Sequence, residues 1–349
     1  MTRGSDSFGY SYDDSGNVTL RTYPDATSVS YSYDDDSRIS AVTRGGNSAN
    51  YSYDAGGAPI QLTLPNGYIE TRTYDAAARV TQIKHSQGAS VLAQFDYAYD
   101  ADRNPTSVTT LSGLETYGYD NRDRLTSVCY QSSCPGGSDP FIRWTYDAVG
   151  NRLTEARPSG TTNYTYDAAD ELSQAGATTY TSDANGNEIA AGNRSFSWNV
   201  ADQLVSTTSG GSTTNYSYDG DGNRVQAAGA STTNYLWDTN VQLPRLALER
   251  TGSGSALRSY AYGHAPLSML AGGQSYYFHA DAIGSIRNVT SASAQTEWTY
   301  SYEPFGATRT ETKNDPMAPD NTARFASELL DPDSSLYDLP EQPHRVHRP

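Results

Sequence analysis

A short phrase built around a Tyr-Asp pair recurs along most of the chain, and this repetition restricts the fold more than any other feature. It reads TTNYTYDAADEL from Thr161, TTNYSYDGDGNRV from Thr213 and WTYDAVGNRL from Trp144. Successive pairs lie about 20 residues apart, which is the signature of an internal repeat. The aspartate marks each copy. The signature pairs are Tyr12 with Asp13, Tyr33 with Asp34, Tyr53 with Asp54, Tyr74 with Asp75, Tyr99 with Asp100, Tyr119 with Asp120, Tyr146 with Asp147, Tyr166 with Asp167 and Tyr218 with Asp219.

Each copy has the composition of a β-hairpin. Tyrosines two residues apart, such as Tyr164 and Tyr166, share one face of a strand, and the small polar residues between them take the other face. Gly and Asn follow the aspartate, where they tolerate positive φ, and the Asp side chain can bond its own backbone two residues on. A run with Val, Ile, Leu or Thr at alternate positions comes next, as in RVTQIK from Arg79, and suits a half-buried strand.

The predicted fold class is therefore all-β: a long antiparallel strip of hairpins that curls into part of a hollow shell. Helix signals are nearly absent, because no long stretch combines apolar residues at helical spacing with a cap. An isolated hairpin is marginal in water, so about a dozen in a row are expected to pair edge to edge, and strand twist makes such a strip curl. With 28 Tyr against 7 Phe, its buried face is amphipathic, which favours a wall lining a wet interior over a dry sandwich core.

Charge and hydropathy exclude several classes of protein. A formal net charge of -16 argues against nucleic-acid binding, which needs a basic surface. No apolar run approaches the ~20 residues of a membrane-spanning helix, and the first residues lack the apolar stretch of a signal peptide. Cys129 and Cys134 are the only cysteines. They either close a disulfide loop or are two incidental thiols in an insertion, and we favour the incidental thiols.

Two segments near the C-terminus relate the repeats to a family. YYFHADAIGSIRNVTSASAQTEWTYSYEPFGATR, from Tyr276, contains Y-x-H-x-D-x-x-G-S and Y-x-P-F-G, and RFASELLDPDSSLYDL follows from Arg324. Together with the YDxxGNRLT-like repeats, they resemble the Rhs or YD-repeat family, which includes bacterial wall-associated proteins, toxin-complex C components and teneurins. Both segments resemble its Rhs-associated core. The core signature residues are here His279, Asp281, Gly284, Ser285, Pro304, Phe305, Gly306, Asp331 and Pro332.

The resemblance implies an organisation of the chain. Residues 1–240 are YD repeats, 241–339 are the Rhs-associated core, and 340–349 are a divergent Pro-rich tail that we expect to be disordered. In that family the strip spirals into a hollow cocoon, the core closes one end, and a variable C-terminal toxin domain is held inside. Several members also carry an aspartyl autoprotease with DP-x-G motifs beyond the core. Here PEQPHRVHRP follows Leu339 instead, so we expect a shell fragment or a decayed remnant, with a frameshift as one version.

The function that the resemblance implies is structural encapsulation, with no enzyme activity, catalytic residue, metal or cofactor. The expected partners are a C-terminal toxin or effector domain, of its own or a neighbouring chain, and the remaining shell segments. Open sheet edges also allow self-association. The expected location is secreted or at a bacterial cell surface, by a route that the sequence does not show. The alternative is an adhesion module that binds carbohydrate on the aromatic faces of Trp144, Trp198, Trp237 and Trp298.

Two groups of residues bear comparison with catalytic or metal sites. His279 and Asp281 share a face in alternating geometry, as an Asp-oriented imidazole would. No Ser or Cys nucleophile motif lies near them, so we predict a structural hairpin role. The acidic turns at Asp183 and Asp219 faintly resemble calcium loops. They lack the glycine and glutamate positions of an EF-hand, so we interpret them as hairpin turns.

Overall fold

The computed structural model describes residues 2–3, 6–131, 134, 140–338 and 346–347, and these lie mainly in β-strands and the turns between them. Strands β3 to β32 form one antiparallel sheet of 30 strands, so the predicted all-β class is confirmed. The strands of this sheet are β3 (Gly9–Tyr12), β4 (Val18–Thr22), β5 (Ser28–Tyr33), β6 (Ile39–Arg44), β7 (Asn47–Tyr53), β8 (Pro59–Thr63), β9 (Ile69–Tyr74), β10 (Val80–Gln87), β11 (Ser90–Tyr99), β12 (Pro105–Thr110), β13 (Gly113–Tyr119), β14 (Leu125–Cys129), β15 (Phe141–Tyr146), β16 (Arg152–Arg157), β17 (Gly160–Tyr166), β18 (Leu172–Ala175), β19 (Thr178–Ser182), β20 (Glu188–Ala191), β21 (Arg194–Trp198), β22 (Leu204–Ser209), β23 (Ser212–Tyr218), β24 (Arg224–Ala228), β25 (Thr232–Asp238), β26 (Arg245–Thr251), β27 (Ala256–Tyr262), β28 (Pro266–Ala271), β29 (Gln274–Ala280), β30 (Ile286–Ser291), β31 (Thr296–Tyr302) and β32 (Thr308–Lys313). The remaining elements are β1 (Thr2–Arg3), β2 (Asp6–Ser7), the 3-10 helix η1 (Phe325–Ser327), β33 (Leu329–Leu330), β34 (Tyr337–Asp338) and β35 (Val346–His347).

The hairpin of β5 and β6 shows how one repeat folds. Tyr33 lies opposite Ile39, and a register shift falls between Ser32 and Tyr33. The Ser37 N–H donates to the Asp34 carbonyl (3.0 Å), which closes a β-turn. A turn followed by a one-residue bulge suits the twist of the two strands. The same shift recurs in the hairpins whose first strands end at Tyr12, Tyr53, Tyr99, Tyr119, Tyr146, Tyr166 and Tyr218.

The residue three places after each marker has a positive φ. The angle is 58° at Ala78, 59° at Ser37 and 84° at Gly16, all in the left-handed region that favours glycine. The set is Gly16, Ser37, Gly57, Ala78, Arg103, Asp123, Gly150, Asp170, Gly186, Asp202, Gly222 and Gly284. Asn17 and Asn151 of the turns are not among the residues with positive φ. The expectation that asparagines serve there by tolerating it was wrong, because their side chains bond the aspartate instead.

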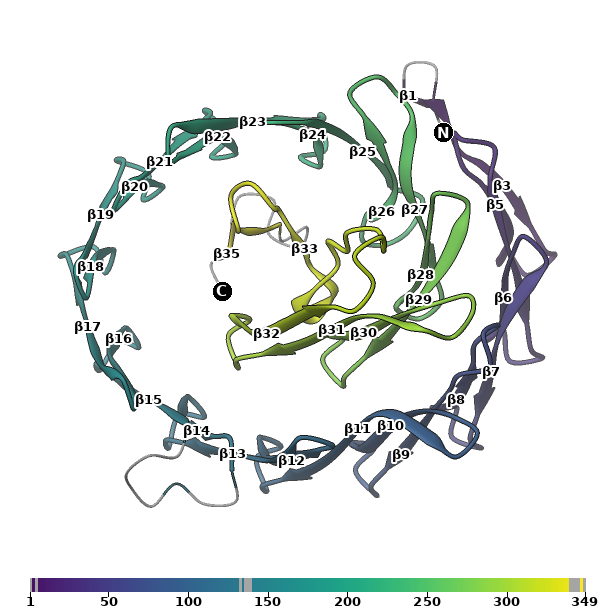
Figure 1. Ribbon diagram of the computed structural model, residues 1–349, viewed down its shortest axis with the longest axis horizontal. Helices are drawn as coiled ribbons and strands as arrows, with labels where there is room; N and C mark the ends of the chain where they lie inside the picture. Colours follow the sequence, from purple (N-terminus) through teal and green to yellow (C-terminus); the bar gives the residue numbers. More distant parts are fainter. Residues whose placement is uncertain (1, 4–5, 132–133, 135–139, 339–345, 348–349) are drawn as a thin grey trace. The chain divides into compact units, whose positions relative to one another are not determined.

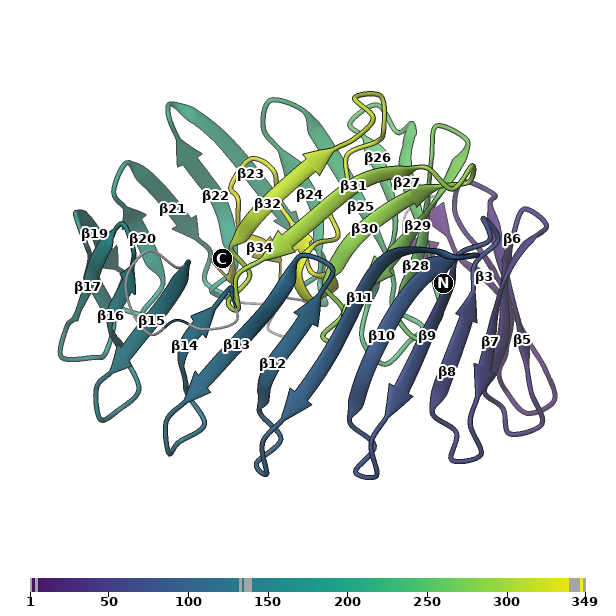
Figure 2. The same cartoon turned by 60° about the horizontal axis from the view of Figure 1, so that its bottom comes forward.

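The chain divides into two compact units, and unit 2 comprises Tyr74–Gln82 and Gln94–Thr214. Its strands follow one another in a single curved layer, from β12 to β22 in Figure 1, and lie side by side in the tilted view of Figure 2. Tyr164 and Tyr166 are half-buried in this layer. The described residues of unit 2 therefore contain no second layer that would bury one face of the sheet completely.

Cys129 and Cys134 of unit 2 form a disulfide. The expectation of two incidental thiols was therefore wrong. Cys129 ends β14, and its Cα atom lies 5.8 Å from that of Cys134, within the ordinary range for a bonded pair.

Unit 1 comprises Met1–Thr73, Ile83–Ala93 and Asn215–Pro349, and it has two layers, with β4 to β7 beside β26 to β29 (Figure 1). One hydrophobic cluster joins the layers. Its members are Phe8, Tyr23, Val29, Tyr31, Val42, Ala49, Leu64, Tyr68, Ala247, Ala261, Leu267 and Tyr277. The preference for a wet lining over a dry core was wrong for these repeats, because the later strands cover their tyrosines. A second cluster lies among the later strands and the segment after them. Its members are Trp237, Leu246, Tyr260, Met269, Phe278, Ile286, Val289, Trp298, Tyr300, Tyr302, Ala318 and Ala323.

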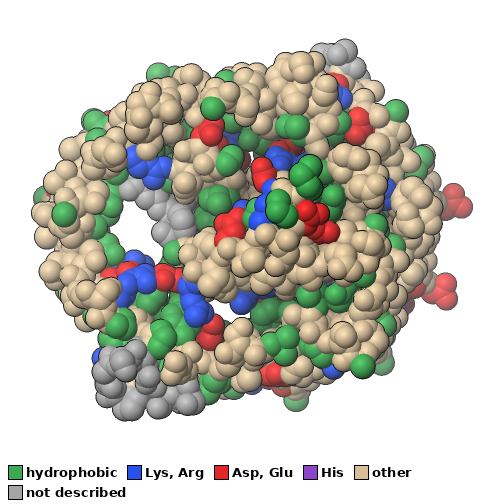
Figure 3. Space-filling view, viewed as in Figure 1, with side chains coloured by type: hydrophobic (Ala, Val, Ile, Leu, Met, Phe, Trp, Pro, Cys, Tyr) green, Lys and Arg blue, Asp and Glu red, His purple; other side chains and the backbone are tan. Residues whose placement is uncertain are grey.

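Of the predicted tail, the structure describes Val346–His347, which pair with β34, and the rest lies outside the described residues. No helix in the described part of the chain is long and apolar enough to cross a membrane. On the face seen in Figure 3, several basic side chains lie beside acidic ones, so the two signs are not separated into large patches.

Candidate functional site

Each marker aspartate fixes its own turn. Asp34 Oδ1 accepts the N–H groups of Asp36 (3.0 Å) and Arg38 (2.9 Å), and Arg38 Nε donates to Oδ2 (2.7 Å). Asp120 has the same arrangement with Arg124. The hydrogen bond from the Arg124 side chain, followed by backbone N–H groups of the turn, lowers the pKa of Asp120 to about 2. Because these donors favour the ionised form, the carboxylate acts as a structural acceptor at neutral pH.

The tyrosine before most of the markers joins its repeat to the preceding strand. Tyr99 Oη donates to the Val80 carbonyl (2.7 Å) and Tyr33 Oη to the Val18 carbonyl (2.9 Å). The same bond runs from Tyr53 to Ile39, Tyr119 to Pro105, Tyr146 to Leu125, Tyr166 to Arg152, Tyr262 to Leu246 and Tyr302 to Ile286. The excess of Tyr over Phe predicted an amphipathic face, but the sequence did not identify the carbonyl groups that accept from these hydroxyls.

The arginine four residues after a marker contacts the next repeat. Arg79 Nη1 donates to the Asp100 carbonyl (2.9 Å), and its guanidinium lies 4.9 Å from the centre of the Tyr99 ring. Arg124 makes the corresponding contacts with Asp147 and the following tyrosine. Such cation–π and charge-assisted contacts are stronger than neutral ones. At Arg79 and Arg124, the aspartate, arginine and tyrosine therefore link one repeat to the next.

The first half of the core signature is a turn that holds η1. Asp281 Oδ1 accepts the Ser285 N–H (2.9 Å), and Oδ2 accepts the Arg287 guanidinium (3.1 Å). Burial raises the pKa of this carboxyl. Gly284 has a φ of 83°, and its carbonyl accepts the Ser327 hydroxyl (2.6 Å). The Ser285 hydroxyl accepts a backbone N–H of η1 (3.0 Å). The turn is thus a docking point for the segment after the sheet.

Pro304, Phe305 and Gly306 lie in the turn between β31 and β32. Gly306 has a φ of 93°, and the Phe325 ring lies 2.9 Å from where its β-carbon would be, so no larger residue fits without a shift. Tyr337 Oη donates to the Gly306 carbonyl (3.5 Å). The glycine of this signature is required by the close approach of η1.

Asp331 and Pro332 lie in a turn that a buried arginine holds. Arg224 Nη1 lies 3.1 Å from Asp331 Oδ2, and Nη2 lies 3.2 Å from Asp338 Oδ2. The Arg224 side chain is only 5% exposed, so it needs these two carboxylates to offset its desolvation. Ser335 of the same turn has a φ of 56°. Serine therefore occupies a left-handed position of the kind that favours glycine.

His279 and Asp281 do not bond each other. His279 is fully buried, its Nδ1 lies 3.3 Å from His85 Nδ1, and its Nε2 lies 2.9 Å from Thr290 Oγ1. The Asp281 carboxylate is bonded within its own turn and to Arg287. His85 is 194 residues away in the sequence, so no local pattern could point to it.

The carboxylates of the acidic turns accept hydrogen bonds from backbone and side-chain groups of the same turns. Asp183 Oδ1 accepts the Asn187 N–H (3.0 Å), and Oδ2 accepts the Asn187 side chain (3.1 Å). Asp219 bonds Asn223 in the same way. Across the described ranges, no three side chains of His, Cys, Asp or Glu are placed to hold a metal ion.

The tryptophans offer little surface to a sugar. Trp144 and Trp237 are each 3% exposed and Trp298 is 6% exposed. Trp198 is half-buried, and its indole N–H donates to the Glu188 carbonyl (2.8 Å). Stacking on a carbohydrate needs an accessible ring face, which the three buried rings lack.

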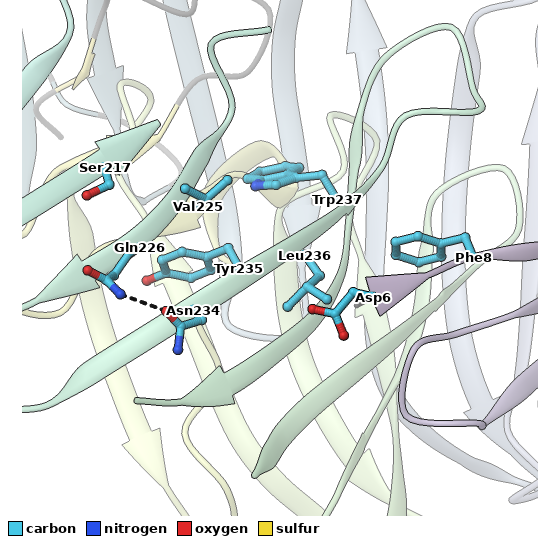
Figure 4. Close-up of a pocket in the computed structure, with 9 residues that line it drawn as sticks. All are labelled: Asp6, Phe8, Ser217, Val225, Gln226, Asn234, Tyr235, Leu236 and Trp237. Carbon is cyan, nitrogen blue, oxygen red and sulfur yellow. Dashed lines mark hydrogen bonds between the residues drawn. The ribbon is translucent and has the colours of Figure 1, made fainter. Parts of the chain in front are cut away.

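A cavity of about 360 Å³ lies in unit 1 between the N-terminal residues and β23 to β25 (Figure 4). Its lining is Asp6, Phe8, Ser217, Val225, Gln226, Asn234, Tyr235, Leu236 and Trp237. Asp6 pairs with Arg250 (2.6 Å), and Gln226 donates to Asn234 (2.8 Å), the bond drawn in Figure 4. These polar groups already have partners in the protein, so the cavity offers a ligand mainly apolar contact.

Known proteins resemble the chain along nearly its whole length. A family model described as Teneurin YD-shell matches residues 2–84 and 112–345. The chain is 26% identical over 245 residues to the tRNA3(Ser)-specific nuclease WapA of Bacillus spizizenii, which covers 69% of this chain and 7% of that protein.

Two solved structures share the fold. The pore of the Photorhabdus luminescens Tc holotoxin, with a mutation in TccC3, superposes with a TM-score of 0.80 at 19% identity, over 98% of this chain and 19% of that chain. The crystal structure of TcdB2-TccC3-Cdc42 gives a TM-score of 0.79 at 18% identity, over 98% of this chain and 20% of that chain. The chain thus spans about a fifth of these structures and far less of WapA.

Proposed function

Because the chain belongs to the teneurin YD-shell family, we propose that it forms the C-terminal wall and Rhs core of a shell that encloses a toxin or effector domain. The enclosed domain is the C-terminal part of its own or a neighbouring chain, and the remaining shell segments complete the wall. In this proposal residues 1–240 are the wall, 241–339 are the core and 340–349 are a divergent tail.

The single-layer sheet of unit 2 carries the proposal. Its repeats are held along the strip by tyrosine hydroxyls, aspartate turns and arginines, as at Tyr166, whose hydroxyl donates to the Arg152 carbonyl (2.9 Å). Because these contacts link each repeat to the next one along the sheet, the sheet of unit 2 is stabilised without a second layer of the same unit. Its half-buried tyrosines offer a guest both apolar surface and hydroxyl groups.

The packing of unit 1 supports the role of the core. The core strands lie on the first repeats through a dry cluster, and Tyr23 Oη donates to the Tyr260 carbonyl (2.7 Å) across it. The core therefore covers the faces of these repeats, which suits a closing element. We propose that the protein acts without catalysis, since the singled-out carboxylates and hydroxyls are bonded within the fold.

The disulfide supports a location outside the cytoplasm. Disulfides persist in oxidising compartments and are rare in the cytosol, and Cys129 is bonded to Cys134. We therefore place the protein in the secreted or surface-exposed fraction of a bacterium.

Protection of a guest tests the proposed function. An unfolded reporter, such as a truncated staphylococcal nuclease, is fused after Pro349 of the full chain and treated with protease at pH 7.5. If the part of the wall that this chain forms already shields a domain fused to its C-terminus, the reporter survives longer than the same reporter fused before Met1. The free reporter mixed with the unfused chain is the second control. Equal lifetimes in all three samples contradict the proposal.

A further inference from the structure

Two buried histidines join the first repeats to the core within unit 1. His85 of β10 is 1% exposed and His279 of β29 is fully buried. Their rings lie 5.0 Å apart and perpendicular to each other. Tyr68 packs edge-on against His279, also at 5.0 Å. Because the two strands come from distant parts of the sequence, this contact belongs to the packing of the layers and not to any one hairpin.

The hydrogen bonds assign both protons. His85 Nε2 lies 2.9 Å from the Ala280 carbonyl, which can only accept, so this nitrogen carries the proton. His85 Nδ1 is then the acceptor for His279 Nδ1–H at 3.3 Å. His279 Nε2 in turn accepts from the Thr290 hydroxyl, which accepts from Asn66 Nδ2 (2.9 Å). One unbroken series of donors and acceptors therefore fits the joint when both imidazoles are neutral.

Few groups around the two histidines can stabilise an added proton on either ring. Glu70 Oε2 of β9 lies 3.8 Å from His85 Nδ1, but Glu70 also accepts from Arg72. Asp281 is paired with Arg287, and the remaining contacts of His279 are the neutral Thr290 hydroxyl and the Tyr68 ring. Burial lowers the pKa of His85, which Glu70 partly opposes. Burial and the neighbouring His85 hold the pKa of His279 well below its usual value.

We propose that His85 and His279 form an acid-sensitive latch that joins the first repeats to the core while both are neutral and releases them when both are protonated. A first proton can be kept on His85 Nδ1, facing Glu70, if His279 moves its own proton to Nε2. A second proton places two N–H groups against each other across 3.3 Å, and no acceptor lies between them. A cavity of about 320 Å³, lined in part by Glu70, Ala280 and Asp281, lies beside this side of the joint, although neither histidine lines it.

The direction of the two histidine pKa shifts sets the pH range over which the joint weakens. The unfolded or opened histidines titrate near pH 6.5, whereas the packed pair stays neutral below that value. The opened state therefore binds more protons, and the joint weakens as the pH falls from about 6.5. Use of the latch to release an enclosed domain rests on the proposed function, but the latch itself does not.

Hydrogen exchange on the full chain without a guest tests the latch. The equilibrium constant for opening β9, β10, β29 and β30 is measured between pH 7.5 and 5.0, after correction for intrinsic exchange. In the natural protein it rises by up to about tenfold per histidine for each pH unit below about 6.5. In the double variant His85→Gln and His279→Asn this rise is lost. His264→Asn changes an exposed histidine that bonds Tyr53 and whose pKa burial also lowers, so this variant is expected to keep most of the rise and lose a smaller part of it.

A second measurement uses the natural protein, so that the proposal can be tested even if the double variant does not fold. In the natural protein with ¹³C-labelled histidine, NMR follows the protonation of each ring. His85 and His279 are expected to stay neutral below pH 6.5 until the segments open. Titration of both near pH 6.5 without opening overturns the proposal, as does the same pH dependence in the natural protein and the double variant. The reporter assay at pH 7.5 tests enclosure separately.

Discussion

At the scale of single residues, one turn position recurs at every marker, and one tyrosine hydroxyl recurs at most of them. The position three places after the marker is left-handed whether glycine occupies it, as at Gly57, or not, as at Ala78. The hydroxyl before the marker reaches a carbonyl on the preceding strand. The left-handed turn residue and the tyrosine hydroxyl are both required by the geometry of the hairpin, whichever residues surround them.

Ala78→Gly is expected to stabilise the protein by about 0.5–1 kcal/mol, because it removes the strain of an L side chain at a φ of 58°. The free energy of unfolding in urea measures the change. Ala77→Gly, one residue earlier in the same exposed turn, is the matched control and is expected to destabilise by a similar amount. Equal effects of the two substitutions contradict the assignment.

Tyr99→Phe is expected to cost about 1 kcal/mol of stability, because it removes only the hydroxyl that donates to the Val80 carbonyl. Tyr99→Leu also removes the ring beneath the Arg79 guanidinium, so its cost is larger. Thermal and urea unfolding of both variants separate the two contributions. If Tyr99→Phe matches the natural protein, the hydroxyl does not stabilise the strip.

At the scale of the element, the hairpin is held by charge as well as by backbone pairing. Asp13, Asp34, Asp75, Asp120 and Asp183 all have a pKa lowered by hydrogen bonds that favour the carboxylate. A carboxyl whose pKa is lower in the folded state stabilises above its unfolded value and loses that effect as the pH falls. The turns are therefore expected to weaken together in acid.

Asp120→Asn is expected to destabilise the protein at pH 7, because the amide cannot pair with the Arg124 guanidinium as the carboxylate does. The difference from the natural protein should shrink as the pH falls from about 4 toward 2, where the natural carboxyl is itself protonated. Urea midpoints across this pH range measure it, with Asp102→Asn at an exposed turn position as the control. A difference that stays constant down to pH 2 contradicts the role of the charge.

At the scale of the whole molecule, each unit solves a different packing problem. Unit 2 is a single layer held along its length, whereas unit 1 places β26 to β29 on the first repeats. Polar groups bridge the two layers of unit 1. Arg21 lies 2.8 Å from Asp238 with side chains 5% and 1% exposed, and Tyr10 Oη donates to the same aspartate (2.6 Å). A buried pair of this kind specifies how the layers meet.

Arg21→Ala is expected to destabilise unit 1 by about 3–5 kcal/mol, because it leaves Asp238 buried without its cation. The free energy of unfolding, followed by hydrogen exchange within unit 1, measures the loss. Asp36→Ala is the control, since it breaks an exposed pair with Arg38 that solvent screens and should therefore cost far less stability. Similar costs for the two variants would show that the buried pair does not join the layers.

The sequence by itself determined the hairpin, its period and the family, because strand pairing, turn chemistry and alternating side chains are local. It could indicate that Asp34 bonds its own turn and that Tyr31 and Tyr33 share a face. Only the tertiary structure determined which faces of the strands stay exposed to solvent. It covered Tyr23 and Tyr31 with the core strands, brought His85 to His279, and paired Arg21 with Asp238. Those contacts join residues about 200 or more apart, and no local preference encodes which distant strand a repeat will meet.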